Sequence, residues 1–385
     1  MNPPATPWSS FSPTRVEFGT GTLNRAGELA TVLGDSAMLV GSNSSRATGA
    51  LARCRASLEE AGISTVEYTV SITSDPTVHE VNALARSLVA GGSDMVVAIG
   101  GGSVLDCAKA AAVLAAQGGS AEEHLLDEYG PATASLPVVA IPTTAGTGAE
   151  LSKGAIVTWP ERVIKSGLRG EALLPEIAIV DPSLTTTVPP LQTRYTGFDA
   201  FAHAVETYLS RRATPMTELF SAAAIPRIVG SLPRALEDPN DLDARTDLSF
   251  CAMLMGYNLA NSSTCLPHRI QYPIGARTGT AHGLGLAALF PSWVHITRAA
   301  SPDRFSVVAG WIGEGLGSPT NDIDEALALF MARIGLRPDL GNLGVRPGDV
   351  AKLAMETSGS LGNDPWWSDS ADLEVILDGA MGKRG

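Results

Sequence analysis

The sequence predicts an α/β domain with a parallel sheet, followed by an all-helical domain. The chain has 385 residues, which is too many for one typical hydrophobic core. From residue 36 onward, short runs that are apolar nearly throughout alternate with segments of helical spacing, as in a parallel sheet covered on both faces. After Pro190 the strand pattern largely vanishes and long helical patterns follow. We therefore place the two domains at residues 1–188 and 189–385.

The expected elements follow from these patterns in order. In the first domain, we expect strands at 36–42 and 64–70, a strand running into glycines within 94–103, and a strand followed by a polar Gly/Thr loop within 136–148. Helices are expected at 46–62, 77–92 and 104–119. In the second domain, helices are expected at about 191–210, 216–236, 243–262, 281–299 and 322–334, with a final short helix at 371–381. The Pro/Gly-rich stretch between Cys265 and Gly283 predicts a turn.

Composition limits the classes of partner. The net charge of −13 leaves no basic footprint for nucleic acid or an anionic membrane, so a small-molecule substrate is expected. The N-terminus "MNPPATPWSSFSP" lacks the basic and apolar parts of a signal peptide, and the longest apolar stretches are too short to span a bilayer. The four cysteines show no paired pattern, which favours a reducing, cytoplasmic setting.

Two polar loops follow predicted strands. "IGGGSVLDCAK" (99–109) leads from a strand into a helix, where glycines and exposed N–H groups suit a phosphate; alone, it fits a tight turn equally well. "PTTAGTGAE" (142–150) follows the next strand, and ligands bind at the carboxyl ends of parallel strands, so a pyrophosphate site becomes the better interpretation. Lys165 would add a cation, unless it is a solvated surface lysine. The candidate cofactor residues in the loops are Gly100, Gly101, Gly102, Ser103, Thr143, Thr144 and Thr147.

A metal site is predicted in the second domain. Asp199 and His203 are four residues apart, so on a helix they share one face, although such a pair alone is usually a surface interaction. His268 and His282 add two imidazoles on either side of the predicted turn. One carboxylate and three neutral nitrogens suit divalent iron or zinc, and leave room for water or substrate in the shell.

At this point the chain resembles the iron-containing (group III) alcohol dehydrogenases over residues 13–383. The matching stretches are "GGGSVLDCAK", "PTTAGTGAE", "AIVDPSLTTTVPP", "GFDAFAHAVE" and the pair of histidines at 268 and 282. The resemblance implies a Rossmann-like dinucleotide-binding domain, a helical metal domain with the active site in the cleft between them, and a cytoplasmic, commonly dimeric, NAD(P)-dependent enzyme. It assigns the metal ligands to Asp199, His203, His268 and His282. It also places Asp106 near the pyrophosphate loop, and nucleotide contacts at Thr143, Thr144 and Lys165.

Three positions depart from the family pattern. Ser42 stands where many members have an aspartate after the first strand; a carboxylate there would repel a 2′-phosphate, so its absence leaves NADP(H) open beside NAD(H). Ala149 has lost the hydroxyl of the usual GTGSE. Tyr272 stands where many members have a second histidine assigned to proton relay; a tyrosine hydroxyl is able to pass a proton as well.

These residues predict a metal-dependent NAD(P)-linked alcohol dehydrogenase or aldehyde reductase. The metal would act as a Lewis acid on the carbonyl oxygen, and Tyr272 or water would supply the proton. Tyr272 and Asp106 are the two candidate catalytic residues. Arg269 and Arg277 favour an anionic substrate, unless they point to solvent or pair with acids. Two alternatives stay open: a dehydroquinate-synthase-like lyase without net redox change, and a catalytically silent nucleotide- or metal-binding protein.

Overall fold

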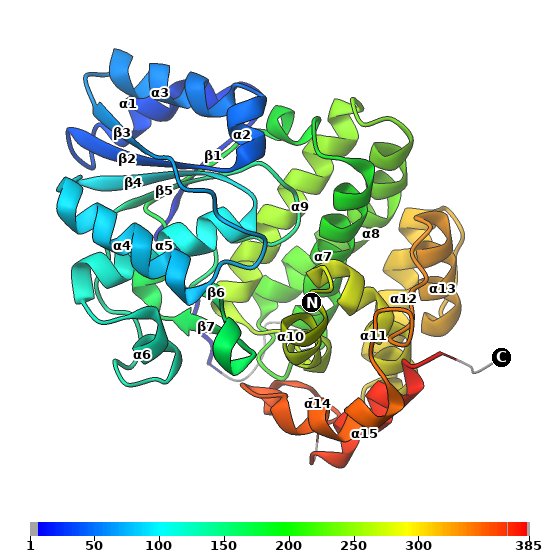
Figure 1. Ribbon diagram of the computed structural model, residues 1–385. Helices are drawn as coiled ribbons and strands as arrows, with labels where there is room; N and C mark the ends of the chain where they lie inside the picture. Colours follow the sequence, from blue (N-terminus) through cyan, green and yellow to red (C-terminus); the bar gives the residue numbers. More distant parts are fainter. Residues whose placement is uncertain (1–6, 368, 383–385) are drawn as a thin grey trace. The chain divides into compact units, whose positions relative to one another are not determined.

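The computed structural model describes residues 7–367 and 369–382, and the chain forms two compact units. Residues 11–188 form an α/β unit, and the chain from Pro189 onward forms a helical unit, which also includes the described residues before Phe11 (Figure 1). The predicted fold class is confirmed.

The α/β unit is built on a six-stranded, all-parallel sheet in the order β1-β8-β5-β4-β2-β3. All four predicted strands are present, whereas the sequence patterns missed the two four-residue strands and an antiparallel hairpin of β6 and β7 outside the sheet. The strands are β1 Arg15–Phe18, β2 Ser36–Gly41, β3 Ser64–Tyr68, β4 Met95–Gly100, β5 Val138–Pro142, β6 Gly154–Trp159, β7 Ile164–Arg169 and β8 Ile177–Val180.

Helices cover both faces of this sheet, as Figure 1 shows. Alternate residues of a strand point to opposite faces, so Val96 and Ala98 pack with α4 and α5, while Val97 and Ile99 pack with α1 and α3. Both faces of the central strands are therefore apolar, which explains their unbroken hydrophobic runs. The helices of this unit are α1 Ala26–Ala30, α2 Asn43–Ala47, α3 Ala50–Glu60, α4 Val78–Gly91, α5 Gly102–Gln117 and α6 Ala121–Leu125.

The carboxyl ends of three neighbouring strands lie in register. Gly41 pairs with Ile99, and Gly100 pairs with Pro142, so the loops that follow β2, β4 and β5 leave the sheet at one edge. The Thr143 N–H donates to the Gly100 carbonyl at 2.9 Å, which ties two of these loops together. The sheet thus brings Ser42, the glycine loop (Gly100 to Ser103) and the threonine loop (residues 142–150) to the same edge.

The helical unit contains every helix that the sequence predicted, together with others. Its described helices are α7 Pro190–Leu209, α8 Pro215–Glu237, α9 Leu242–Asn261, α10 Leu266–Thr278, α11 His282–Thr297, α12 Pro302–Leu316, α13 Ile323–Arg333, α14 Val350–Glu356 and α15 Ala371–Gly379. The patterns missed α12 and α14. The turn predicted between Cys265 and Gly283 was wrong for most of its length, because α10 fills it despite an interior proline at Pro273.

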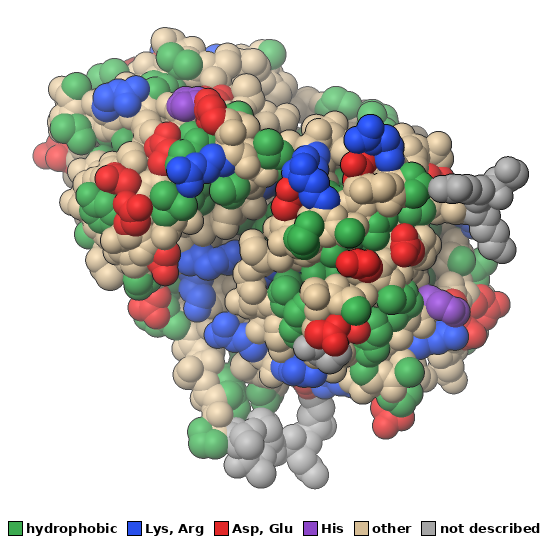
Figure 2. Space-filling model, turned by 60° about the horizontal axis from the view of Figure 1, so that its bottom comes forward, with side chains coloured by type: hydrophobic (Ala, Val, Ile, Leu, Met, Phe, Trp, Pro, Cys, Tyr) green, Lys and Arg blue, Asp and Glu red, His purple; other side chains and the backbone are tan. Residues whose placement is uncertain are grey.

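The surface carries charges of both signs. On the face shown in Figure 2, lysine and arginine side chains are interspersed with aspartate and glutamate. Within the described part of the chain, no helix is both long and apolar enough to span a bilayer.

Candidate metal centre and nucleotide loops

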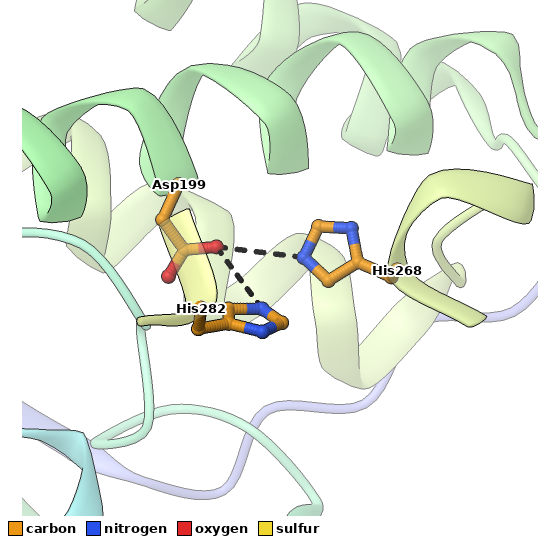
Figure 3. Close-up of side chains that lie close together, drawn as sticks. All are labelled: Asp199, His268 and His282. Carbon is orange, nitrogen blue, oxygen red and sulfur yellow. Dashed lines mark ion pairs between the residues drawn. The ribbon is translucent and has the colours of Figure 1, made fainter. Parts of the chain in front are cut away.

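Three side chains from three helices converge on one point in the helical unit. Asp199 lies on α7, His268 on α10 and His282 at the first position of α11, and their ligating atoms all lie within 4.8 Å of one another. Figure 3 shows one oxygen of the Asp199 carboxylate facing both imidazoles, with a dashed line to each. Asp199 Oδ1 lies 3.5 Å from His268 Nε2 and 3.6 Å from His282 Nε2.

His203, one turn after Asp199 on α7, also lies beside this cluster. Its Nε2 lies 3.6 Å from Asp199 Oδ1, and its ring stacks on that of His268 with centroids 4.4 Å apart. It is not within the mutual 4.8 Å distance that unites the other three. Two ligands about 2.1 Å from one ion lie at most about 4.2 Å apart, so His203 is a candidate fourth ligand whose ring must move toward the other three when an ion binds.

The spacing of these atoms fits a small cation. Ligands about 2.1 Å from one ion at tetrahedral angles lie about 3.4 Å apart, close to the 3.5 and 3.6 Å found here. Asp199 Oδ1 and His268 Nε2 are also buried without a hydrogen-bond partner among the described residues. Buried polar atoms are normally paired, so two orphaned acceptors facing each other indicate a site for an ion.

The electrostatics of the cluster point the same way. Burial by itself raises the pKa of Asp199, but the surrounding imidazoles of His203, His282 and His268 outweigh it and hold that pKa well below its usual value. Burial lowers the pKa of His268, whereas the carboxylates of Glu206 and Asp199 raise it to about 10. The site therefore favours positive charge at its centre.

Two residues that the sequence analysis missed orient His268 and His282. Glu206 Oε1 accepts a hydrogen bond from His268 Nδ1 at 2.6 Å, and Gln271 Oε1 accepts one from His282 Nδ1 at 2.5 Å. With Nδ1 protonated, each ring presents the lone pair of Nε2 toward Asp199, which is the tautomer that a metal requires. The signal for Glu206 was its spacing, since it follows His203 by three residues on the same helix.

Buried carboxylates also explain why α10 forms. The Cys265 N–H donates to Glu206 Oε2 at 2.8 Å, and the Leu266 N–H donates to Asp364 Oδ2 at 3.3 Å. Acidic groups at a helix N-terminus satisfy unpaired N–H groups and interact favourably with the helix dipole. Glu206 therefore serves both the helix that carries His268 and the tautomer of His268 itself.

Replacing Glu206 with glutamine is expected to lower metal affinity by about 10- to 100-fold, because a neutral amide holds the His268 tautomer less firmly than a carboxylate does. Chelator competition with zinc or ferrous iron measures this affinity. Glu237→Gln, at the exposed end of α8, is the matched control and should bind metal as the wild type does. Equal affinities for all three proteins would contradict the assigned role.

The glycine loop is shaped by close approach of the threonine loop. A Cβ at Gly102, the first residue of α5, would lie 2.7 Å from Thr147 Oγ1, and one at Gly101 would lie 3.4 Å from Thr144 Oγ1. Only glycine fits at 102 without a shift of Thr147. The N-terminus of α5 and the hydroxyls of both threonines thus lie together, as a phosphate cradle requires.

The other predicted nucleotide residues lie close to these loops. Ser42 caps the N-terminus of α2, because its Oγ accepts a hydrogen bond from the Ser45 N–H at 3.0 Å. Lys165, on β7, forms an ion pair with Asp75 at 2.7 Å, and the Asp75 N–H donates to Ser103 Oγ at 3.2 Å. The Lys165 cation therefore already has a carboxylate partner, which links it to the glycine loop.

Asp106 belongs to a buried cluster behind these loops. Its Oδ2 accepts a hydrogen bond from the Ile156 N–H at 3.0 Å, and its Oδ1 lies 3.3 Å from Lys109 Nζ. The fully buried Lys109 also donates to the carbonyls of Ala149 at 2.8 Å and Gly154 at 2.5 Å. These contacts hold the end of the threonine loop and the start of β6 against α5.

Glu150, buried beside this cluster, predicts a pH dependence of stability. Burial raises its pKa from 4.5 to about 7, against the lowering effects of its own backbone N–H and of Lys109. Between these two values the folded chain holds a proton that the unfolded chain releases, so stability falls as pH rises. The Glu150→Gln variant lacks this titration, and its stability relative to wild type should increase by about 3 kcal/mol between pH 4 and pH 8. Urea unfolding at both pH values measures the difference; a pH-independent offset would contradict it.

Of the remaining candidate residues, Tyr272 and Arg269 lie near the metal cluster, whereas Arg277 pairs with Glu356. Tyr272 lies one turn after His268, with its ring stacked at 6.2 Å from that of His282. Arg269 is buried, and its guanidinium lies 5.8 Å from the centre of the Tyr272 ring. Arg277 instead forms an ion pair with Glu356, donating from Nε at 2.6 Å and also from Nη2.

A parallel sheet with a glycine-threonine edge and a helical unit with an Asp/His cluster define a class, the metal-dependent nicotinamide-linked dehydrogenases. Two family profiles match the chain: "Iron-containing alcohol dehydrogenase" over residues 13–182, and "Fe-containing alcohol dehydrogenase family, C-terminal" over residues 193–378. The chain belongs to the iron-containing alcohol dehydrogenase family and is an oxidoreductase.

Individual relatives agree with this assignment. Long-chain-alcohol dehydrogenase 1 of Geobacillus thermodenitrificans is 33% identical, covering 84% of each chain. The NAD-dependent methanol dehydrogenase of Bacillus methanolicus is 30% identical, covering 89% of this chain and 91% of the relative. The crystal structure of an archaeal halo-thermophilic alcohol dehydrogenase from a Red Sea brine pool superposes with a TM-score of 0.90 at 28% identity, covering 97% of this chain and 99% of the other. Neither the lyase nor the silent alternative is favoured.

Proposed function

We propose that this chain reduces small aldehydes or ketones with NAD(P)H, and oxidises the corresponding alcohols, at a metal held by Asp199, His203, His268 and His282. The observation that carries the proposal is the placement of one buried carboxylate oxygen 3.5 to 3.6 Å from three imidazole nitrogens. Reduction adds one hydride to the carbonyl carbon and one proton to the oxygen. When bound, a divalent ion would supply Lewis-acid polarisation of the carbonyl, and the reduced nicotinamide would supply the hydride.

The chain's own residues divide the remaining work. Gly100 to Ser103, Thr143, Thr144 and Thr147 would bind the pyrophosphate through N–H and hydroxyl donors, with Lys165 close by. Glu206 would hold His268, and Gln271 would hold His282, in the tautomer that can bind a metal. Tyr272 Oη would pass the proton toward the substrate oxygen, since its ring lies against a ligand. Asp106 would support the threonine loop through Lys109 rather than touch the substrate.

An assay of metal and cofactor tests this function. The purified chain, stripped with chelator and reloaded with ferrous iron or zinc, is offered a panel of aldehydes with NADH and NADPH. Metal-dependent oxidation of either nucleotide supports the proposal, and the faster metal identifies the working ion. If no carbonyl compound causes net nucleotide consumption with either metal, the proposed activity is wrong and the lyase alternative returns.

Introducing a carboxylate at Ser42 should shift the enzyme toward NADH. Because a serine leaves a 2′-phosphate unopposed at the end of β2, we propose that the wild type accepts NADPH. The Ser42→Asp variant should lower the NADPH-to-NADH ratio of kcat/KM by at least about tenfold, while aspartate still caps α2. The control Thr48→Asp lies at the exposed C-terminal end of the same helix. A similar ratio in the wild type and the Ser42 variant would contradict a role for position 42.

We also propose a homodimer in a reducing, cytoplasmic setting. All four cysteines are buried and unbridged, which suits such a compartment. The dimer rests on the resemblance alone, and sedimentation analysis decides it: a monomer at micromolar concentration would remove that part of the proposal.

A further inference from the structure

Arg269 is a buried cation whose donors find only neutral acceptors. It follows the ligand His268 on α10 and is 4% exposed. Its Nη2 donates to Ser263 Oγ at 3.3 Å and to Thr264 Oγ1 at 3.1 Å. Its Nε is buried with no hydrogen-bond partner, and no carboxylate lies within ion-pair distance of it among residues 7–367 and 369–382.

The contrast with Arg277 sharpens this observation. Both arginines lie on α10, and the sequence makes both of them candidates for binding an anionic substrate. Arg277 is partly exposed and is neutralised by Glu356, whose carboxylate accepts hydrogen bonds from Nε and Nη2 of the arginine. Arg245 on α9 is also buried among neutral acceptors, but its partners are Pro239 and Thr193 rather than groups at the metal cluster. Arg269 alone of these three combines an unpaired charge with a place at the cluster.

The physical consequence follows from desolvation. A buried guanidinium loses its hydration, and hydroxyl acceptors without charge recover only part of that loss. An oxyanion recovers more, because carboxylate, sulfonate and phosphonate oxygens accept charge-assisted hydrogen bonds from the arginine fork. The unpaired Nε leaves one donor of that fork without an acceptor.

The surroundings of Arg269 connect it to the metal cluster. The guanidinium lies over the ring of Tyr272, and that ring stacks on His282. His282 is the most exposed of the four candidate ligands, with 25% of its side chain accessible against 3 to 6% for the others. On the other flank runs the loop around Gly359, where a Cβ would lie 3.6 Å from Arg269 Nη1. This loop therefore packs against the guanidinium at van der Waals distance.

We propose that Arg269 binds an anionic group of the substrate, and that the enzyme acts on short aldehydes or alcohols bearing a carboxylate, sulfonate or phosphonate. The inference rests on the proposed function, because it places the reacting carbonyl at the metal and the anion at Arg269. It assigns selectivity, rather than hydride transfer, to this residue.

The test compares matched aldehydes on the metal-loaded enzyme. Succinic semialdehyde, sulfoacetaldehyde and phosphonoacetaldehyde are the anionic probes, with propanal and butanal as neutral ones. The wild type should prefer at least one anionic probe, and the best of the three identifies the anion. In Arg269→Gln the anionic-to-neutral ratio of kcat/KM should fall by roughly 10- to 100-fold. In Arg269→Lys, which keeps the charge but not the planar guanidinium, this ratio should fall less. Arg277→Ala should keep the wild-type ratio.

Several outcomes would overturn the proposal. They are an active wild type without preference for any anionic probe, an Arg269→Gln variant that keeps the preference, and a rise in the KM for NAD(P)H with the ratio unchanged. The last would assign Arg269 to the nucleotide. If no aldehyde is reduced, the proposed function fails separately, and calorimetric binding of 3-hydroxypropionate and isethionate against 1-propanol still decides whether Arg269 holds an anion. Thermal unfolding of each variant excludes a folding defect.

Discussion

Replacing Asp199 with asparagine is expected to abolish metal binding and to lower kcat/KM by at least about 1000-fold, since Lewis-acid polarisation of a carbonyl contributes several kcal/mol. Asp199 Oδ1 lies within 3.6 Å of all three imidazole Nε2 atoms. Asparagine keeps the shape but removes the negative charge around which the cluster is organised. Metal content of the purified variant and its aldehyde reductase activity are the measurements.

The Asp199→Asn variant is expected to remain folded. Asparagine keeps the volume and the apolar packing around it, so loss of the favourable carboxylate–imidazole interactions should lower stability without unfolding the helical unit. Far-UV circular dichroism and thermal unfolding check this point. Asp303→Asn, on the exposed first turn of α12, is the matched control. A variant of Asp199 that retains stoichiometric metal and near-wild-type activity would disprove the assigned centre.

Replacing Lys109 with methionine is expected to destabilise the α/β unit by about 3–5 kcal/mol. The change leaves Asp106 buried without its ion-pair partner, and removes the donor that serves the carbonyls of Ala149 and Gly154. Methionine fills a similar volume, so the loss measures the charge and its hydrogen bonds rather than a cavity. Urea unfolding followed by far-UV circular dichroism gives the free energy of unfolding.

The neighbouring Lys153 provides the control for this experiment. Lys153 lies at the end of the loop between β5 and β6, next to Gly154, and is only half-buried. Lys153→Met should therefore change stability by less than about 0.5 kcal/mol. Because Lys109 holds the threonine loop, the KM for NAD(P)H should also rise in the Lys109 variant and not in the control. Equal unfolding free energies for the two variants would contradict the bracing role of Lys109.

Much of this molecule follows from local sequence. Apolar runs such as "DMVVAIG" fix buried parallel strands, because both faces of the sheet are covered. The spacing of Asp199 and His203 places both on one helix face, and the structure agrees. The short strands β1, at the sheet edge, and β8, beside it, were missed because four residues carry too little periodicity to be recognised.

The tertiary structure decided what the residues between Cys265 and Gly283 become. Locally, the prolines and glycines there predict a turn, but carboxylates from Glu206 and Asp364, 59 and 98 residues away in sequence, cap its first turn and stabilise α10. Only then does His268 face Asp199, Gln271 reach His282, and Arg269 become buried while Arg277 finds Glu356. The sequence by itself determined the types of the candidate ligands and the four longer strands of the sheet, because these depend on side-chain chemistry and short-range periodicity. Long-range contacts decided the orientation and pairing of each polar side chain, since burial and distant partners set their energies.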